Sequence, residues 1–445
     1  MRDLLLARPV TDVDLVVDDD AEGAARSLGR ELRAAVFPLS ERHGAWRVMG
    51  GGRTVDITAS RGSLVDDLGM RDFTVNAIAI PLDGGEPLDP FDGRRDLDRR
   101  LLRTVSGAVF DDDPLRLLRL VRISCEVDLE IDPDAADLAR SRASLADRPS
   151  GERIFMEMRR LLACDDPADG IRLLEQLGLL AVVLPELATL RGVPQNPHHH
   201  LDVLDHTLLV LDGAADIADH PGFYLPAHEA MLTDRLRRVV GDDMTAGHAL
   251  RMAALFHDVG KPLTRTEREP GWHGFKGHDT VGAELTATVM RRWKTSTSLR
   301  RFCSVLVREH LRLGFTIARR PLDRRAAHVY SRATNPWAVE SVLLSLADRL
   351  ATRGLRARPR HLRVHHQTAD EMLTLLEELQ RDRRPPLIRG DEIARVTGAS
   401  GSAIAELVGA LAEEQAAGTV TTAEQAERFV VEHAAATAPA QGAGR

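Results

Sequence analysis

Two acidic residues near the amino end are spaced like a pair of metal ligands. Asp12 and Asp14 alternate with Val13 and Leu15, and in a strand residues two positions apart project from the same face. Two carboxylates on one face can hold Mg²⁺ ions whose remaining ligands are the phosphate oxygens of a nucleotide. Such ions polarise an attacking hydroxyl and neutralise a leaving pyrophosphate. Taken alone, the pattern also fits a polar edge strand near a turn.

A second group of polar residues suits recognition of a nucleotide. Arg71 can grip phosphate oxygens with its planar guanidinium, and Asn76 can hydrogen-bond a ribose or a phosphate. Asp113 and Arg116 are three positions apart, which places them on one face of a helix, where they offer an acceptor and donors to a base edge. Alternatively, Asp112 and Asp113 form the acidic start of a helix, with Asp112 as its cap.

Three further residues extend this prediction less strongly. Arg119 and Arg122 continue the helix of Arg116, where they either face the nucleotide or form a solvated surface. Asp56 lies in another strand-like run and is a candidate third carboxylate.

A separate set of ligand-type residues occurs roughly 190 positions later. It comprises His206, the adjacent pair His257 and Asp258, and Asp348. A neighbouring histidine and aspartate offer a nitrogen and an oxygen, and ligands from distant helices complete a site for Mn²⁺, Mg²⁺, Ni²⁺ or Fe. A site of this kind keeps positions open for water and phosphate, as hydrolysis requires. Read singly, each histidine is a packed or surface residue.

The spacing H…HD…D and the string Leu255–Lys261 resemble the HD phosphohydrolase superfamily. The resemblance implies that His278 and His310 are ligands of a second metal ion, and Lys261 can hold a phosphate. We expect the triplet His198 to His200 to belong to a linker, because adjacent side chains diverge.

Four ordered segments resemble class II tRNA nucleotidyltransferases (CCA-adding enzymes) and bacterial poly(A) polymerases. They are Arg2–Asp14, Arg71–Ala77, Leu88–Val105, and Asp112–Arg119, where the family usually has Glu-Asp-x-x-Arg. The resemblance extends over nearly the whole chain. It implies that Asp12 and Asp14 are catalytic and bind Mg²⁺, and that tRNA, CTP and ATP are the partners.

The same resemblance implies a nucleotide-binding set in which Asp113 and Arg116 select CTP and then ATP without a template. That set is Arg2, Asp3, Arg71, Asp72, Asn76, Asp113, Arg116, Arg119 and Arg122.

One departure concerns the amino end. The resembled family has a strand and a Gly-Gly pair before the residues that match Arg2 and Asp3, and these glycines let backbone N–H groups approach the triphosphate. Here Met1 precedes Arg2 directly. We therefore expect either a misassigned start or a head whose sheet lacks its first strand and binds nucleotide weakly.

The bulk composition is that of a globular protein with several domains. The chain has 445 residues, 43% hydrophobic and 28% charged, with few aromatic residues. No apolar run is long enough for a membrane span, the amino end lacks a signal-peptide pattern, and three scattered cysteines favour a reducing cytoplasm. We expect a cytoplasmic protein that does not bind membranes.

Charge gives two opposing indications about nucleic acid. The net charge of −8 disfavours a basic coat, whereas local arginine clusters suit phosphate contacts. One cluster, Arg353 to His366, can line the path of an RNA acceptor stem or form a solvated basic helix. Residues 386–432 resemble the family's tail, which grips the tRNA elbow.

The predicted fold is multidomain: an α/β nucleotidyltransferase head with a mixed sheet, an all-α neck, an HD-type helical domain and a helical tail. We expect strands at Val13–Val17, Trp46–Met49, Thr54–Thr58, Ala77–Pro81 and Leu101–Val105, a helix at Ala21–Val36, and no strand after Asp113.

The predicted boundaries follow the change from mixed to helical periodicity. They are 1–110 for the head, 111–190 for the neck that selects nucleotide and binds RNA, 198–353 for the metal-binding helical domain, 354–433 for the tRNA-binding body and tail, and 434–445 for a disordered end.

Three functions remain open at this stage. The first is a template-independent tRNA nucleotidyltransferase that adds C, A or both, with an attached metal-dependent phosphohydrolase; a poly(A) polymerase would share its motifs. The second is an HD-type phosphohydrolase or phosphodiesterase with an inactive head. The third is a non-catalytic RNA-binding remnant.

Overall fold

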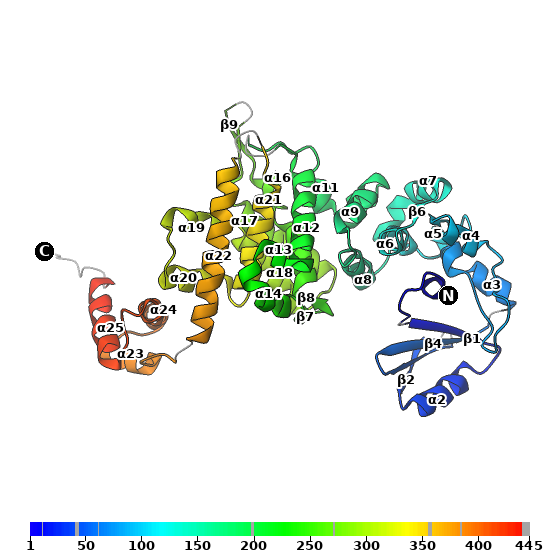
Figure 1. The fold of residues 1–445 in the computed structure, drawn as a ribbon, viewed down its shortest axis with the longest axis horizontal. Coiled ribbons are helices and arrows are strands. Elements are labelled where there is room, and N and C mark those ends of the chain that lie inside the picture. The colour runs from blue at the N-terminus through cyan, green and yellow to red at the C-terminus, as the bar shows by residue number, and fades with distance from the viewer. Residues whose placement is uncertain are drawn as a thin grey trace. The chain divides into compact units, whose positions relative to one another are not determined.

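The computed structural model describes residues 1–10, 12–40, 44–60, 62–196, 200–269, 272–354, 358–382 and 385–437. The chain divides into two compact units. Unit 1 comprises Met1–Cys164 and Arg172–Val183, and unit 2 comprises Asp165–Ile171 and Leu184–Arg445. Helices predominate, and the largest sheet belongs to unit 1 (Figure 1).

Unit 1 opens with the short helix α1 (Arg2–Leu5) and a four-stranded sheet, which is mixed as predicted but includes a strand at Ala35–Ser40 that was not expected. The strands are β1 (Asp12–Val17), β2 (Ala35–Ser40), β3 (Ala45–Gly50) and β4 (Arg53–Ala59), in the spatial order β1-β4-β3-β2. β1 runs parallel to β4, and the other neighbours pair antiparallel. β1 is an edge strand, and its polar side chains Asp12 and Asp14 are exposed.

Helix α2 (Ala21–Leu32) covers one face of this sheet. Asp20 caps its start by accepting a hydrogen bond from the Gly23 N–H at 2.7 Å. Ala21 and Ala25 are buried against Val48 and Ile57 of the sheet. Small residues on this helix face allow it to approach the sheet closely and hold the strands in register.

Some predicted boundaries are wrong. The helix expected to reach Val36 ends at Leu32, because Arg33 adopts a left-handed conformation (φ 49°). Val36 lies in β2, where it pairs with Val48 of β3. No strand covers Ala77–Pro81, where Ala79 forms only an isolated bridge to Leu88.

The strand expected at Leu101–Val105 shortens to β5 (Leu101–Leu102). This strand pairs in parallel with β6 (Glu130–Ile131), which lies in the region where no strand was expected.

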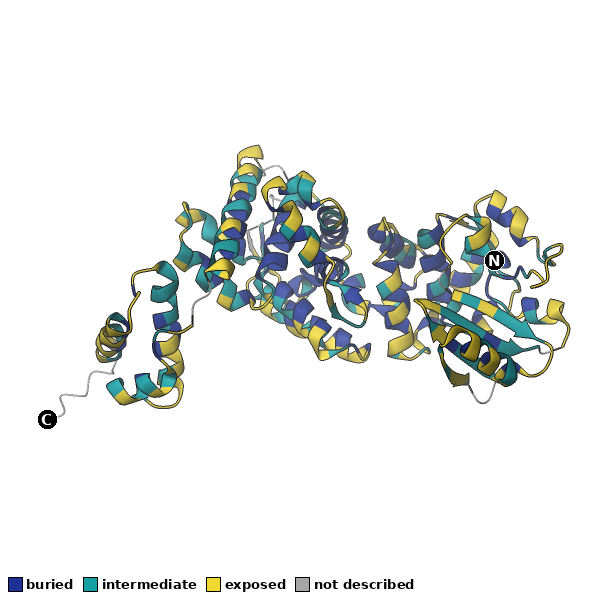
Figure 2. Cartoon of the chain, turned by 60° about the horizontal axis from the view of Figure 1, so that its bottom comes forward, coloured by how far each residue is buried: buried dark blue, intermediate teal, exposed yellow. Residues whose placement is uncertain are grey.

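The rest of unit 1 is mainly helical. The helices are α3 (Leu64–Gly69), η2 (Thr74–Asn76), α4 (Gly93–Asp98), α5 (Val109–Asp112), α6 (Arg116–Val127), α7 (Pro133–Arg142), η3 (Ala143–Asp147), α8 (Gly151–Leu161) and α10 (Leu180–Val183), while α9 (Pro167–Gln176) continues from one unit into the other. α6 packs against α8 through an apolar side that includes Leu117, Leu120 and Val121. Figure 2 shows the resulting division of helices into buried and exposed sides.

Unit 2 is built around a helical bundle. Its principal helices are α12 (Val203–Asp219), α15 (Ala246–Phe256), α17 (His278–Arg292), α18 (Thr297–Glu309) and α21 (Ala338–Ala351). α15 and α21 are buried over most of their length, so their few polar residues lie within the bundle. Polar groups in such a place need partners.

Shorter elements and a long helix surround the bundle. They are α11 (Pro185–Ala188), α13 (Pro221–Tyr224), η4 (Pro226–His228), α14 (Glu229–Leu236), α16 (Lys261–Thr264), α19 (Arg312–Thr316), η5 (Ile317–Arg319), α20 (Arg324–Thr334) and α22 (Pro359–Arg381). Two hairpins, β7 (Val239–Gly241) with β8 (Met244–Thr245) and β9 (Thr266–Glu269) with β10 (Trp272–Gly274), correct the expectation that no strand follows Asp113.

Three helices with their own apolar core end unit 2. They are α23 (Gly390–Thr397), α24 (Ser402–Ala417) and α25 (Ala423–Thr437). Arg332 of α20 donates to Glu413 of α24 at 2.9 Å, which links this tail to the bundle. Among the described residues, no helix combines the length and apolar character needed to cross a bilayer.

Candidate functional site

The edge strand β1 presents the two predicted carboxylates on one side. Asp12 and Asp14 are exposed, whereas Val13 and Leu15 are partly buried. Asp14 lies in register with Asp56 of the neighbouring parallel strand β4. The sheet therefore gathers three carboxylates on one face.

Asp56 differs from the other two because a guanidinium engages both of its oxygens. Arg47 of β3 donates to each oxygen at 2.7 Å. The hydrogen bond to Asp56 raises the pKa of Arg47, and the carboxylates of Asp12 and Asp14 contribute to the same shift. Asp56 is thus in place as a third carboxylate but is neutralised by Arg47.

A chain of hydrogen bonds connects the amino-terminal helix to the second motif. Arg2 pairs with Asp3 through two bonds of 3.0 and 3.1 Å and donates to the Asn76 side-chain oxygen at 3.1 Å. The Asn76 amide donates to Asp72 at 2.9 Å, and Arg119 donates to the other Asp72 oxygen at 2.8 Å. These five predicted nucleotide-binding residues therefore form one connected network.

Asp72 is the buried centre of that network. It is 5% exposed and also accepts from the Phe73 N–H at 2.8 Å. Burial alone would raise the pKa of Asp72, but the Arg119 charge and the hydrogen bonds lower it overall. A carboxylate used in this way positions its neighbours and has little capacity left for a nucleotide.

Arg71 extends toward the metal-type carboxylates. Its guanidinium lies 3.9 Å from an Asp14 oxygen and 3.4 Å from an Asp67 oxygen. The side chain is about one third exposed, at 32%. It can therefore turn from these carboxylates to the phosphates of a bound nucleotide.

The predicted helical pairing of Asp113 and Arg116 is wrong in its geometry. Asp113 is extended (φ −145°, ψ 101°) between α5 and α6, because Pro114 disfavours a helical conformation in the residue before it. Asp112 is the last residue of α5 and does not cap α6.

Both predicted base-reading residues already have partners. Asp113 accepts from the Arg153 guanidinium at 2.7 Å and from the Leu115 N–H at 3.2 Å. Arg116 donates to the Met70 carbonyl at 2.6 Å and to the Val109 carbonyl at 3.3 Å. The structure thus places them on adjacent elements but not on one helix face.

Arg122 does not belong to this surface. It is 2% exposed and donates to Glu157 of α8 at 2.7 Å, with a second bond to Glu126. The pair joins α6 to α8 within unit 1. Both the nucleotide-facing and the solvated interpretations of Arg122 are therefore corrected to a buried ion pair between helices.

In unit 2, six predicted ligands from five helical elements converge in two clusters. His206 comes from α12, His257 and Asp258 follow α15, His278 begins α17, His310 ends α18, and Asp348 lies on α21. One cluster is His206, His257 and Asp348, and the other is Asp258, His278 and His310. Within each cluster the ligand atoms lie within 4.8 Å of one another.

Asp258 lies between the two clusters. Its Oδ2 is 3.1 Å from His257 Nε2 and 3.7 Å from His206 Nε2. Its Oδ1 is 3.4 Å from His278 Nε2 and 4.0 Å from His310 Nε2. The carboxylate can thus bridge two cations, one on each side.

Backbone carbonyls orient three of the histidines. The Nδ1 atoms of His257, His278 and His310 lie 2.8, 2.7 and 2.6 Å from the carbonyl oxygens three residues earlier. An Nδ1–H that donates to a carbonyl leaves the Nε2 lone pair for a metal ion. Among the described residues, the polar neighbours of buried His257 Nε2 are other ligand-type groups, with Asp258 Oδ2 at 3.1 Å but not in good hydrogen-bond geometry, so the donor set fits an ion.

Protonation of the cluster follows from burial and neighbouring charge. Burial lowers the pKa of His310 to about 4 and also lowers the pKa of His206. Burial alone would raise the pKa of Asp348 and Asp258, but histidine neighbours, and Lys261 beside Asp258, lower both. Burial alone would lower the pKa of His257, but the Asp258 charge and hydrogen bond raise it overall. The forms that bind metal ions are the ionised carboxylates and neutral imidazoles.

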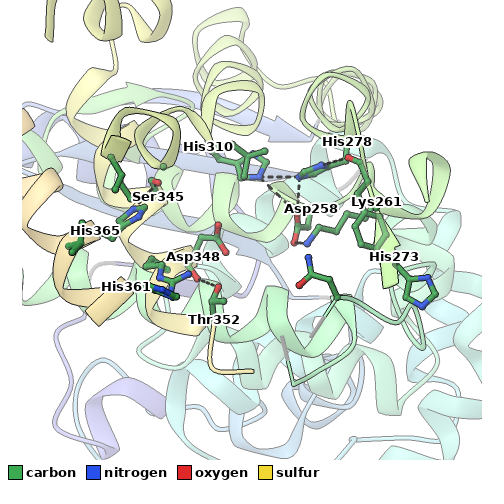
Figure 3. A pocket seen from close by; sticks show the side chains of 18 of the residues that line it. Asp258, Lys261, His273, His278, His310, Ser345, Asp348, Thr352, His361 and His365 are labelled. Atoms are coloured by element: carbon green, nitrogen blue, oxygen red, sulfur yellow. Dashed lines mark hydrogen bonds and ion pairs between the residues drawn. The ribbon is translucent and has the colours of Figure 1, made fainter. Parts of the chain in front are cut away.

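A cavity of about 770 Å³ is lined by four of these residues, Asp258, His278, His310 and Asp348. Lys261 lines it and is buried, with its Nζ 2.6 Å from Asp258 and 2.7 Å from the Gln195 side-chain oxygen. Figure 3 shows Asp258, His278 and Lys261 on one side of this space. On the opposite wall, sequence reasoning predicted Asp348 of α21 as a ligand and assigned the start of α22 to RNA, but it missed Arg349, because no motif marks it.

The histidine triplet and the basic segments give mixed results. His200 is exposed, while His198 and His199 lie outside the described residues, as do Arg356, Arg383 and Arg384. His365 is buried beside Ser345 at 3.2 Å, and His366 Nε2 lies 2.6 Å from the Tyr224 carbonyl. His366 therefore contributes to packing, His365 and Arg360 line the cavity, and Arg358 and Arg363 are exposed. The RNA contact predicted for this segment stays a prediction.

Comparison with protein families yields three matches along the chain. The family described as the poly A polymerase head domain matches residues 1–103, the probable RNA- and SrmB-binding site of polymerase A matches 128–190, and the HD domain matches 203–353.

Curated relatives extend over almost the whole chain. The A-adding tRNA nucleotidyltransferase of Deinococcus radiodurans is 35% identical, with 97% of this chain and 93% of that protein aligned. The CC-adding tRNA nucleotidyltransferase of Thermus thermophilus is also 35% identical, over 97% and 91%.

Solved structures share the fold at low sequence identity. A CCA-adding enzyme in complex with ATP gives a TM-score of 0.62 at 19% identity, with 98% of this chain and 89% of that chain aligned. The Thermotoga maritima CCA-adding enzyme complexed with tRNA gives 0.55 at 19% identity, over 97% and 89%. The predicted fold class is therefore confirmed.

The Asp72 network predicts a pH-dependent contribution to the stability of unit 1. Asp72→Asn should lower the free energy of unfolding at pH 7 by about 1–3 kcal/mol, because it weakens buried charge-assisted hydrogen bonds. The folded-state pKa is lowered, so this stabilisation is complete above about pH 4 and is lost as the pH falls through the folded-state pKa.

Denaturant titrations at acidic and neutral pH would measure the difference in the free energy of unfolding between the wild type and Asp72→Asn. The exposed Asp128, paired with Arg100, provides a control: Asp128→Asn should change stability by no more than about 0.5 kcal/mol. A stability difference for Asp72→Asn that stays constant into acid would contradict the assignment.

Proposed function

Because this chain belongs to the family of tRNA nucleotidyltransferases, we propose that it extends the 3′ end of tRNA with C, A or both, using CTP and ATP without a template. The observation that carries the proposal is the pair of exposed carboxylates, Asp12 and Asp14, on one face of β1 beside Arg71. Since these substrates occur together in the cytoplasm, we expect the protein to act there.

The reaction needs two kinds of side chain from the head, carboxylates that hold metal ions and a guanidinium that binds phosphate. The terminal RNA hydroxyl forms a bond to the α-phosphorus of the nucleotide, and the bond to pyrophosphate breaks. Asp12 and Asp14 would hold Mg²⁺, which supplies positive charge to the triphosphate when bound. Arg71 would pair with phosphate oxygens, as a planar guanidinium does.

The network around Asp72 prepares this surface. Asp72 holds Asn76 and Arg119, and Asn76 accepts from Arg2. We infer that Arg2, Asn76 and Arg119 contact the nucleotide at their remaining donors, while Asp72 and Asp3 position them. Asp113 and Arg116 would read the base once their present partners are exchanged for it.

The nucleotide choice is open to direct measurement. Relatives at equal identity add A in one case and CC in the other. The protein is incubated with tRNA that lacks the whole CCA end, or with tRNA that lacks only the terminal A. CTP alone, ATP alone or both are supplied, and the length of the products distinguishes the possibilities. A long homopolymer of A would instead indicate poly(A) synthesis.

The two ligand clusters favour a second activity in unit 2. We propose a metal-dependent phosphohydrolase in which His206, His257 and Asp348 would hold one ion and His278 and His310 another, with the Asp258 carboxylate facing both sets. Mn²⁺, Mg²⁺, Ni²⁺ or Fe suits these nitrogen and oxygen donors. Bound ions would withdraw charge from a phosphate ester and make an attacking water more acidic.

Loss of either head carboxylate should abolish nucleotide addition. Asp12→Asn and Asp14→Asn should each lower incorporation of labelled nucleotide into tRNA that lacks its 3′ end by about 10²–10³-fold or more, as expected when a main electrostatic stabiliser is lost. The exposed Asp18 nearby gives the control Asp18→Asn, which should retain activity. Full incorporation by folded Asp12→Asn and Asp14→Asn proteins would disprove this assignment.

Metal content should follow the two clusters. In an Asp12→Asn, Asp14→Asn background loaded with Mn²⁺ and desalted, mass spectrometry of the metal should find two ions per chain. His257→Ala and His278→Ala should each remove one, and Asp258→Asn should weaken both, because its two oxygens face opposite clusters.

The exposed His220 on the same unit supplies the control His220→Ala, which should keep two ions. One ion in the starting protein, or no change on removing Asp258, would contradict a bridged pair. Hydrolysis of phosphomonoesters to free phosphate, or of 2′,3′-cyclic nucleotides to nucleoside monophosphates, should be lost in His257→Ala and kept in Asp12→Ala.

A further inference from the structure

The cavity of unit 2 has two chemically different sides. Asp258, His278 and Lys261 lie on one side, and Asp348, His361 and His365 lie on the other (Figure 3). The proposed metal ions account for the first side and for Asp348. The remaining wall, from the end of α21 and the start of α22, has no assigned role.

Arg349 is the unexplained group on that wall. It lines the cavity directly after the proposed ligand Asp348. Its Nε is buried and has no hydrogen-bond partner within the described part of the chain. A buried guanidinium nitrogen without an acceptor is costly, and an anionic ligand would supply one.

The basic groups that line the cavity differ in whether they can bind an anionic ligand. Lys261 is held by Asp258 at 2.6 Å. Burial lowers the pKa of His365 to about 4, and this neutral ring lies 3.2 Å from Ser345 Oγ. Arg360, which also lines the cavity, is exposed at the first turn of α22. The two guanidiniums are therefore the cationic groups suited to a ligand on this wall.

We propose that Arg349 and Arg360 form a phosphate subsite apart from the metal ligands, so that the cavity takes phosphate esters that carry a second phosphate. One phosphate would lie beside the proposed metal ligands, where water forms a bond to phosphorus and the ester bond to the alcohol oxygen breaks, and the other would accept hydrogen bonds from the guanidiniums. The volume of about 770 Å³ is in the range that holds a nucleotide-sized ligand. This inference rests on the proposed phosphohydrolase function.

The test compares two substrates that differ only in the second phosphate. The intact protein, loaded with Mn²⁺, is assayed with adenosine 3′,5′-bisphosphate and with adenosine 3′-monophosphate. We expect kcat/KM for the bisphosphate to be about 10–100-fold higher, the factor typical of charge-assisted hydrogen bonds. Arg349→Met should remove most of this preference and leave the monophosphate rate within about threefold.

Two variants separate recognition from support of the fold. Arg349→Lys keeps the charge without the planar fork and should retain part of the preference. Arg291, exposed on α17 with a bond to Thr288, gives the matched control Arg291→Met, which should keep all of it. Equal rates on both substrates in the wild type would overturn the proposal. Equal losses of kcat/KM on both substrates in Arg349→Met would also overturn it. That pattern would mean that Arg349 only holds the neighbouring ligand Asp348 in place and does not bind the second phosphate.

A third substrate distinguishes the source of the second phosphate. In a dinucleotide with a 3′-phosphate, the second anion is an RNA phosphodiester. A gain with both this compound and the bisphosphate supports the subsite and points to RNA ends, whereas a gain with the bisphosphate alone supports it and points to a free nucleotide.

If none of these substrates is hydrolysed, the proposed phosphohydrolase function is refuted. The phosphate subsite is then tested by binding. Isothermal titration of the Mn²⁺-loaded protein should then show at least about tenfold tighter binding of the bisphosphate than of the monophosphate, lost in Arg349→Met. Equal affinities would overturn the subsite.

Discussion

The buried carboxylate of Asp258 is the constraint on which unit 2 depends. It is 2% exposed, and His206, His257, His278 and Lys261 surround it from four different elements. An isolated buried carboxylate would be strongly destabilising, so its partners must arrive together. A shift of α12, α16 or α17 relative to the end of α15 would therefore separate the Asp258 carboxylate from a group that stabilises its charge.

Unit 1 uses the same physical device for a different purpose. Asp72 is buried and fully engaged, while Asp12 and Asp14 stay exposed on the edge strand. The buried carboxylate organises Asn76 and Arg119, and the exposed carboxylates keep their oxygens available. Positioning and ligand binding are thus divided between acidic residues that look equivalent in the sequence.

The sequence was sufficient where chemistry is encoded in local patterns or a recognisable spacing. Asp12 and Asp14 share a strand face because alternation is a local property, and the six ligand-type residues of unit 2 come together as the motif spacing predicted. Predictions that depended on where a helix begins or ends were wrong in two places. Pro114 separated Asp113 from the helix of Arg116, and the left-handed Arg33 ended α2 early.

What the sequence could not supply was the identity of partners distant in the chain. Arg122 looked like one of a series of exposed arginines until Glu157, 35 positions away, was seen to bond to it. Arg349 carries no motif, and its interest arises only because folding buries its Nε beside a cavity. Long-range burial and pairing determine whether an arginine is structural, solvated or available to a ligand.

The contrast in burial also separates the two proposed metal sites. On the head, two exposed carboxylates provide few protein ligands, so an ion there would be completed by the phosphates of the nucleotide and would arrive and leave with it. In unit 2, most ligand atoms are buried nitrogens and oxygens whose ring orientations are fixed by backbone carbonyls. Such a preformed, largely dehydrated donor set favours an ion that stays in place between turnovers. One chain can therefore carry both kinds of site without competition, because the head depends on substrate for its metal affinity and the helical bundle does not.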